Sequence, residues 1–228
     1  MDKILLKPTL SDATYYGRFA DLAFEPLANP IPVYKTLLKY LSKYGATLKD
    51  VKIDTTTLSE ANISCHMLDL HTMITWRLDR IQANFFKLQE IGEETARTIL
   101  LDSCRAVSEV DPSIEFAEHE VLIQSLTKIE GPSYDTVMRR YINTQTAPGE
   151  KVHAGVVSYS ASDPAKGQNR GSLVLDRWVG QEQGLLLKVS VVFDAKKVPI
   201  DSLPQRIDDY LTEQLDQLGL RLDRGQPG

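Results

Sequence analysis

Hydrophobic and polar residues alternate with a period of two over much of the chain, a pattern typical of β-strands with one buried face. The alternation is clear over residues 62–67 and again from residue 72 to 88. The second run is longer than an ordinary strand of about 5–6 residues, so we expect a bend near Asp79 and Arg80. Five further segments are predicted as strands: residues 15–24, 114–129, 152–160, 172–179 and 185–193.

Four other segments carry hydrophobic residues at helical spacing. One helix begins near Pro32 and ends at Gly45, a second begins at Gly92, and a short third follows Ser133. The closing helix has Asp201 or Ser202 as its cap and ends at Gly219. Its hydrophobic stripe consists of Ile207, Tyr210, Leu211, Leu215 and Leu218.

The two halves of the chain repeat the same order of elements, β-α-β-β-β-(β)-α. We therefore predict an α+β fold with two tandem repeats, at about residues 13–110 and 113–222. Their strands would form a mostly antiparallel sheet, shaped as a saddle or half-barrel and covered by helices. Residues 1–228 would make one compact domain, with a flexible tail at 223–228.

This element order resembles helix-grip-like duplicated folds, of which the TATA-box-binding protein saddle is the best-known example. It also resembles a sporadically distributed family of uncharacterised prokaryotic proteins. The residues that carry this likeness are the strand end at 21–26, with its turn at Pro26, and the strand at 185–194 that leads into the helix at 201–218. The resemblance implies duplicated units but assigns no functional residue, because that family has no established activity.

Charge and composition narrow the classes of partner. The formal net charge is −5, which argues against duplex DNA and anionic membranes, since both favour clustered Lys and Arg. Apolar runs such as residues 189–193 are far shorter than the roughly 20 residues that a membrane span needs. Two cysteines cannot build a disulfide framework, so we expect a cytoplasmic protein.

Candidate metal ligands and catalytic groups are sparse. Cys65, His66, Asp69 and His71 lie close in sequence, but neighbours on a strand point to opposite faces. Only Cys65, Asp69 and His71 could share a face, and zinc needs about four ligands. We expect no metal and no cofactor, and for His119, between two glutamates, an exposed sheet position rather than a general base.

Two features could contact a partner. The segment from Lys166 to Arg170 combines glycine with two cations, and is either a hairpin tip or a contact for an anion or partner. Trp76 and Trp178 fall in predicted strands, where they either line a groove or pack in the core. A modest basic surface is formed by Lys35, Lys39, Lys43, Arg139 and Arg140. Such surfaces are usually solvated, so we expect no contact with RNA there.

These observations favour a non-enzymatic protein-binding or assembly module that uses its sheet face or sheet edge. A partner would be another polypeptide or a second copy of the chain. The alternatives are a small-molecule-binding helix-grip-like protein and an enzyme whose site residues are scattered along the chain.

Overall fold

A computed structural model describes residues 3–54, 57, 60–141 and 155–223 of the chain. Its ten strands are β1 (Ile4–Phe19), β2 (Val51–Asp54), β3 (Asn62–Met67), β4 (Thr72–Arg77), β5 (Arg80–Phe85), β6 (Phe116–Ile129), β7 (Val156–Ser160), β8 (Gln168–Arg177), β9 (Gly184–Asp194) and β10 (Leu220–Leu222). Its α-helices are α1 (Glu25–Ala28), α2 (Pro30–Leu41), α3 (Leu88–Ile91), α4 (Glu93–Val110), α5 (Tyr134–Met138) and α6 (Leu203–Gln217). Short 3-10 turns occupy Ser42–Tyr44, Leu48–Asp50 and Ile200–Ser202.

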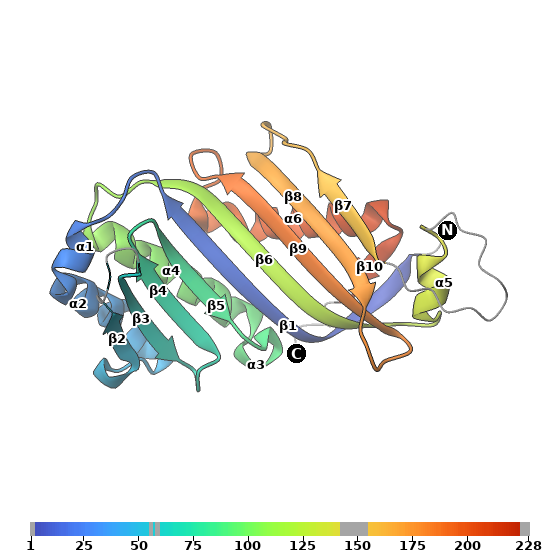
Figure 1. Ribbon diagram of the computed structural model, residues 1–228, viewed down its shortest axis with the longest axis horizontal. Coiled ribbons are helices and arrows are strands. Elements are labelled where there is room, and N and C mark those ends of the chain that lie inside the picture. Colours follow the sequence, from blue (N-terminus) through green and yellow to red (C-terminus); the bar gives the residue numbers. More distant parts are fainter. Residues whose placement is uncertain (1–2, 55–56, 58–59, 142–154, 224–228) are drawn as a thin grey trace.

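The strands form one open, mostly antiparallel sheet, so the predicted α+β class is confirmed. Its order is β2-β3-β4-β5-β1-β6-β9-β8-β7. The short strand β10 lies outside this order and pairs with β1 in parallel. The long strands β1 and β6 lie side by side at the centre (Figure 1). Each half of the chain therefore contributes one central strand and a meander that runs from the sheet edge inward.

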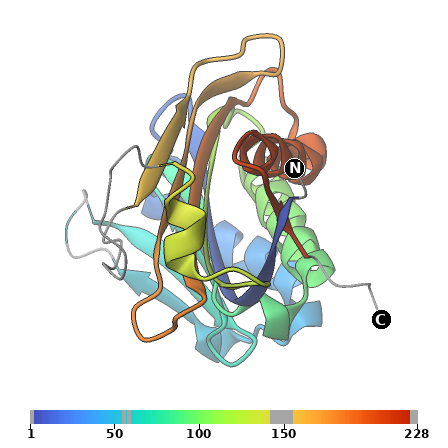
Figure 2. The ribbon, with the colours of Figure 1, turned by 90° about the vertical axis from the view of Figure 1, so that its right-hand side faces the viewer.

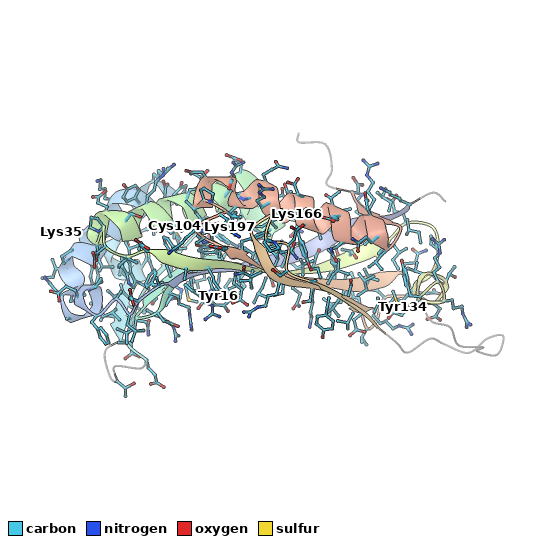
Figure 3. All side chains as sticks on the ribbon, turned by 90° about the horizontal axis from the view of Figure 1, so that it is seen from above. Tyr16, Lys35, Cys104, Tyr134, Lys166 and Lys197 are labelled. Atoms are coloured by element: carbon cyan, nitrogen blue, oxygen red, sulfur yellow. The ribbon has the colours of Figure 1, made fainter. Side chains whose placement is uncertain are left out.

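Helices α4 and α6 lie along one face of the sheet (Figures 1 and 2). They are amphipathic, as predicted, and bury their apolar sides: Ile99, Leu100 and Val107 from α4, and Tyr210, Leu211 and Leu215 from α6. Between the two register shifts of the β1–β6 pair, the helix-facing positions of β1 and β6 are odd-numbered, such as Tyr15 and Val121, as are those of β9, such as Val189. Tyr16, an even-numbered residue of this stretch, points away from the helices (Figure 3). Before the shift at Pro8 and Leu10 the buried residues of β1 are instead the even-numbered Ile4 and Leu6.

The first strand begins earlier and ends sooner than the sequence predicts. It runs from Ile4 to Phe19 rather than from residue 15 to 24, and it pairs with β6 along most of its length. Pro8 lies within this strand although proline cannot donate a ladder hydrogen bond. The structure accommodates Pro8 at a register shift between Pro8 and Leu10, which leaves the strand continuous.

Two further predictions differ in detail. The expected bend near Asp79 is a hairpin turn, so residues 72–88 contain the two strands β4 and β5. Strand β10 was not predicted, because only its distant pairing with Ile4–Leu6 of β1 defines it. Residues 152–154 of the predicted strand and residues 224–228 of the predicted tail lie outside the described residues.

Candidate interaction surface

The sheet ends in two outer strands of different chemistry, β2 and β7 (Figure 1). The β2 strand carries Lys52 and Asp54 among its four residues. Charged residues on an edge strand discourage pairing with another chain. The β7 strand has the sequence Val-Val-Ser-Tyr-Ser and carries no charge. Within the described chain, no strand pairs with its outer side.

The β7 strand is held in an extended conformation by its inner neighbours. It pairs antiparallel with β8 over all five residues. The Ser160 hydroxyl lies 2.9 Å from the Tyr210 hydroxyl of α6 and accepts a 3.0 Å hydrogen bond from Nε2 of Gln168. Gly171 leaves room for this contact, because a Cβ there would collide with the Tyr210 hydroxyl. One edge of β7 is thus fixed, while no strand of the described residues pairs with its other edge.

Exposed apolar side chains accompany this edge on the face away from the helices. Val157 is 50% exposed and Tyr159 is 81% exposed. Their β8 neighbours in register are Val174 and Ser172. Among the described residues, this strand combines an outer side that has no strand partner with apolar side chains, which is the arrangement that strand addition uses.

The centre of the same face is polar and internally paired. Arg18 donates a 2.8 Å hydrogen bond to Glu120, and the Arg80 guanidinium lies 5.6 Å from the centre of the Tyr16 ring. These arginines are therefore engaged by neighbours on the sheet itself.

The helix-covered face buries a polar cluster at the centre of the sheet. The Tyr15 hydroxyl lies 2.9 Å from Nδ1 of His119, and Sγ of Cys104 on α4 lies 3.6 Å from the same hydroxyl. Burial lowers the pKa of His119 to about 4 and raises the pKa of the Cys104 thiol to about 12. Burial, followed by the neighbouring Cys104, also raises the pKa of Tyr15. All three groups are held neutral and away from solvent.

His119 corrects a prediction from the sequence. It is 2% exposed and faces α4, whereas an exposed sheet position was expected. The odd-numbered positions of β6 face the helices, so His119 lies in the core while Glu118 and Glu120 lie on the other face. The position opposite His119 on β1 is Gly17, whose missing side chain leaves room for the Tyr15 and Phe116 rings.

The candidate metal ligands are not brought together. Cys65 is fully buried on β3, and burial raises its pKa to about 11. Leu68, Asp69 and Leu70 all have positive φ and form the turn to β4, which breaks the alternation that would align Cys65 with His71. Nδ1 of His71 instead lies 3.3 Å from the Glu90 carboxylate. No group of three metal-ligating side chains occurs among the described residues.

Part of the predicted basic surface is neutralised by α4. Lys39 contacts Glu109 at 2.7 Å, and Lys43 contacts Asp102 at 2.8 Å. Asp102 is buried and also accepts a 2.8 Å hydrogen bond from the Tyr44 hydroxyl. Its burial alone would raise its pKa, but the hydrogen bonds from Lys43 and Tyr44 outweigh this and hold the pKa below its usual value. These contacts join α2 and its following turn to α4.

The four predicted partner-contact residues lie in different places. Trp76 has no exposed surface and faces the helices, so it belongs to the core rather than to a groove. Trp178 is half-buried at the turn between β8 and β9. Lys166 contacts Glu213 of α6 at 2.7 Å (Figure 3). Only Arg170, exposed on β8 one strand from the edge, lies beside the surface described above.

A second exposed region lies on the outer side of α6. An open, polar-lined hollow there includes Asp208, Asp209, Glu213 and Asp216. Lys166 pairs with Glu213, and Lys3 pairs with Asp216 at 2.7 Å. Basic residues from other elements therefore already contact this acidic side.

Sequence reasoning did not single out the residues of β7, although a signal was present. Residues 156–160 are uncharged, whereas the strand at 51–54 that forms the other edge has a lysine and an aspartate. That difference becomes informative only once both segments are known to be edges. No helix in the described part of the chain is long and apolar enough to cross a membrane. The chain matches no protein-family model and no curated protein.

Proposed function

We propose that this protein is a non-enzymatic binding module that accepts an extended polypeptide strand on the outer edge of β7. The observation that carries this proposal is the exposed, uncharged edge of β7 in a sheet whose other edge is charged. Main-chain hydrogen bonds would supply affinity, and side chains that alternate along the added strand would supply specificity. Val157 and Tyr159 are the side chains that such a strand would contact.

The buried state of the reactive side chains supports a non-enzymatic role. Cys65 and Cys104 are both buried. Burial raises the pKa of the Cys65 thiol to about 11 and that of the Cys104 thiol to about 12. A nucleophilic cysteine needs a lowered pKa and access to solvent. The neutral, buried His119 contacts Tyr15 rather than a surface group. The chemistry of this cluster is that of a polar core contact.

We also propose that the two halves are structural repeats, in which no described strand of the second half corresponds to β2. In the first half the meander is β2-β3-β4-β5, which leads to β1. In the second half it is β7-β8-β9, which leads to β6. Under this correspondence β7 matches β3, whose outer edge is covered by β2 in antiparallel pairing. An added antiparallel strand would give β7 the neighbour that β3 already has.

A peptide-display experiment tests the edge. The protein is panned against a random heptapeptide library, and selected peptides are measured against the wild type and against Val157→Lys/Tyr159→Lys. We expect peptides rich in β-branched and aromatic residues whose binding weakens at least about tenfold on the variant, because the lysines blunt the edge. Ile53→Lys on β2 is the matched control and should leave binding unchanged. Equal binding to the wild type and the β7 variant would contradict the proposal.

A further inference from the structure

We propose that the strand received by β7 is the β7 strand of a second copy, so that the protein forms a two-fold dimer with one continuous sheet. This inference rests on the proposed function of the same edge and names its partner. It follows from the uncharged sequence of the strand, from the residues that meet across the pair, and from the charges on the neighbouring strand.

Antiparallel pairing about Ser158 uses every residue of the strand. It places Ser158 opposite its own equivalent, Val157 opposite the partner's Tyr159, and Val156 opposite the partner's Ser160. Residues that pair directly in an antiparallel sheet lie on the same face. The exposed face of one copy therefore continues the exposed face of the other, and both helical layers lie on the opposite side. The direction is also that of β2 on β3.

The side chains that meet are compatible. Val157 and Tyr159 are both exposed on the single chain. In the dimer, Val157 of each copy would pack against Tyr159 of the other copy. Pairs of an aromatic and a β-branched residue stabilise antiparallel sheets. No charge on either strand opposes its equivalent, because β7 has none. The dimer thus removes from water the apolar side chains that flank the edge.

Charges on β8 favour the antiparallel direction. Arg170 lies one residue beyond the Gly171–Ser160 pair, and Asp176 lies one residue beyond the Leu175–Val156 pair. Both are exposed and share the face of Val157 and Tyr159. A two-fold axis through Ser158 puts Arg170 of each copy in the same row as Asp176 of the other. Those two β8 strands would be about 14 Å apart, three strand spacings, across which the long arginine reaches toward the carboxylate. Parallel pairing in register would instead align like charges.

The test combines the mass in solution with a charge exchange. Sedimentation velocity of the full chain should give a concentration-dependent species of 51.2 kDa, twice the chain mass of 25.6 kDa. Two double variants are then prepared, Val157→Lys/Tyr159→Lys and Val157→Glu/Tyr159→Glu. Each places like charges at positions 157 and 159 of the two copies, so the dimer dissociation constant should rise at least about tenfold. Mixing the two variants should restore the dimer, which also shows that each is folded.

The outcomes separate this inference from the proposed function. A wild-type monomer at all concentrations that still selects edge-dependent peptides would overturn the dimer and leave strand addition in place. A dimer whose mass is unaffected by both double variants would also overturn the inference, because its interface would lie elsewhere. A monomer without edge-dependent peptides would overturn both. If mixing the two double variants restores the dimer, and the Ile53→Lys control remains dimeric, the result would support both the dimer and strand addition at β7.

Discussion

The Tyr15 hydroxyl on β1 lies 2.9 Å from Nδ1 of His119 on β6, at the junction between the two halves of the sheet. The imidazole is buried beneath α4, and burial lowers its pKa to about 4. A neutral ring can accept the hydrogen bond from Tyr15, and the hydroxyl can accept from Cys104. This contact links the two central strands through polar groups rather than through apolar packing alone.

The low pKa of His119 predicts a loss of stability in mild acid. The unfolded ring binds a proton near pH 6.5, whereas the native ring does so only near pH 4. Its contribution is complete above pH 6.5 and is lost as the pH falls toward 4, on the order of 3 kcal/mol in total. Urea unfolding of the wild type and of His119→Gln should show a difference in pH dependence over this window. Parallel pH profiles would contradict the buried neutral state.

Gly17 should resist substitution because two rings occupy the space beside it. A Cβ at this position would meet the Tyr15 hydroxyl and lie 2.7 Å from Cε1 of Phe116. Gly17→Ala should therefore cost about 1–3 kcal/mol of unfolding free energy, the usual range for overpacking. Tyr15→Phe removes the colliding oxygen, so the double variant should lose less stability than the two single changes added together. Additive losses in denaturant unfolding would refute this steric account.

Asp102 and Glu109 offer a matched comparison on α4. Both pair with lysines near the end of α2, but the Asp102 side chain is 3% exposed and that of Glu109 is 39% exposed. Asp102→Ala should cost about 1–3 kcal/mol, because it removes charged hydrogen bonds from a buried position. Glu109→Ala should cost within about 1 kcal/mol, as exposed ion pairs do. Equal losses in thermal unfolding would show that burial does not set the difference.

Both native thiols should be unreactive in the folded protein. Cys65 and Cys104 are buried, and burial raises both pKa values above that of a free thiol. A thiol-specific aromatic disulfide reagent at pH 8 should label neither until denaturant is added. Rapid labelling of one thiol in the native protein would place a cysteine at the surface and weaken the non-enzymatic interpretation.

Local patterns predicted the elements whose boundaries are set by their own sequence. The stripes of α4 and α6 and the alternation in β3 and β9 required no knowledge of the fold. The remainder depends on distant partners. Residues 4–14 become a strand because β6 lies beside them and a register shift absorbs Pro8, and β10 exists because it meets β1.

The sequence predicted the type of interaction surface but not the strand that forms it. A sheet edge was among the expected interaction sites, but no local pattern tells which strand is outermost. The side of β6 on which His119 lies was also undetermined, because alternation fixes a period and not a direction. The position of α4 over the odd-numbered residues decides it.

A disulfide trap tests the central account of the β7 edge most directly. In the antiparallel pair, the Cβ atoms at position 158 would face each other about 4.5–5.5 Å apart, whereas those at position 157 would be about 7–8 Å from their own equivalents. Oxidation of Ser158→Cys should therefore give a covalent 51.2 kDa dimer, twice the chain mass of 25.6 kDa, while Val157→Cys should give little. No covalent dimer from Ser158→Cys, or equal yields from both variants, would contradict pairing about Ser158.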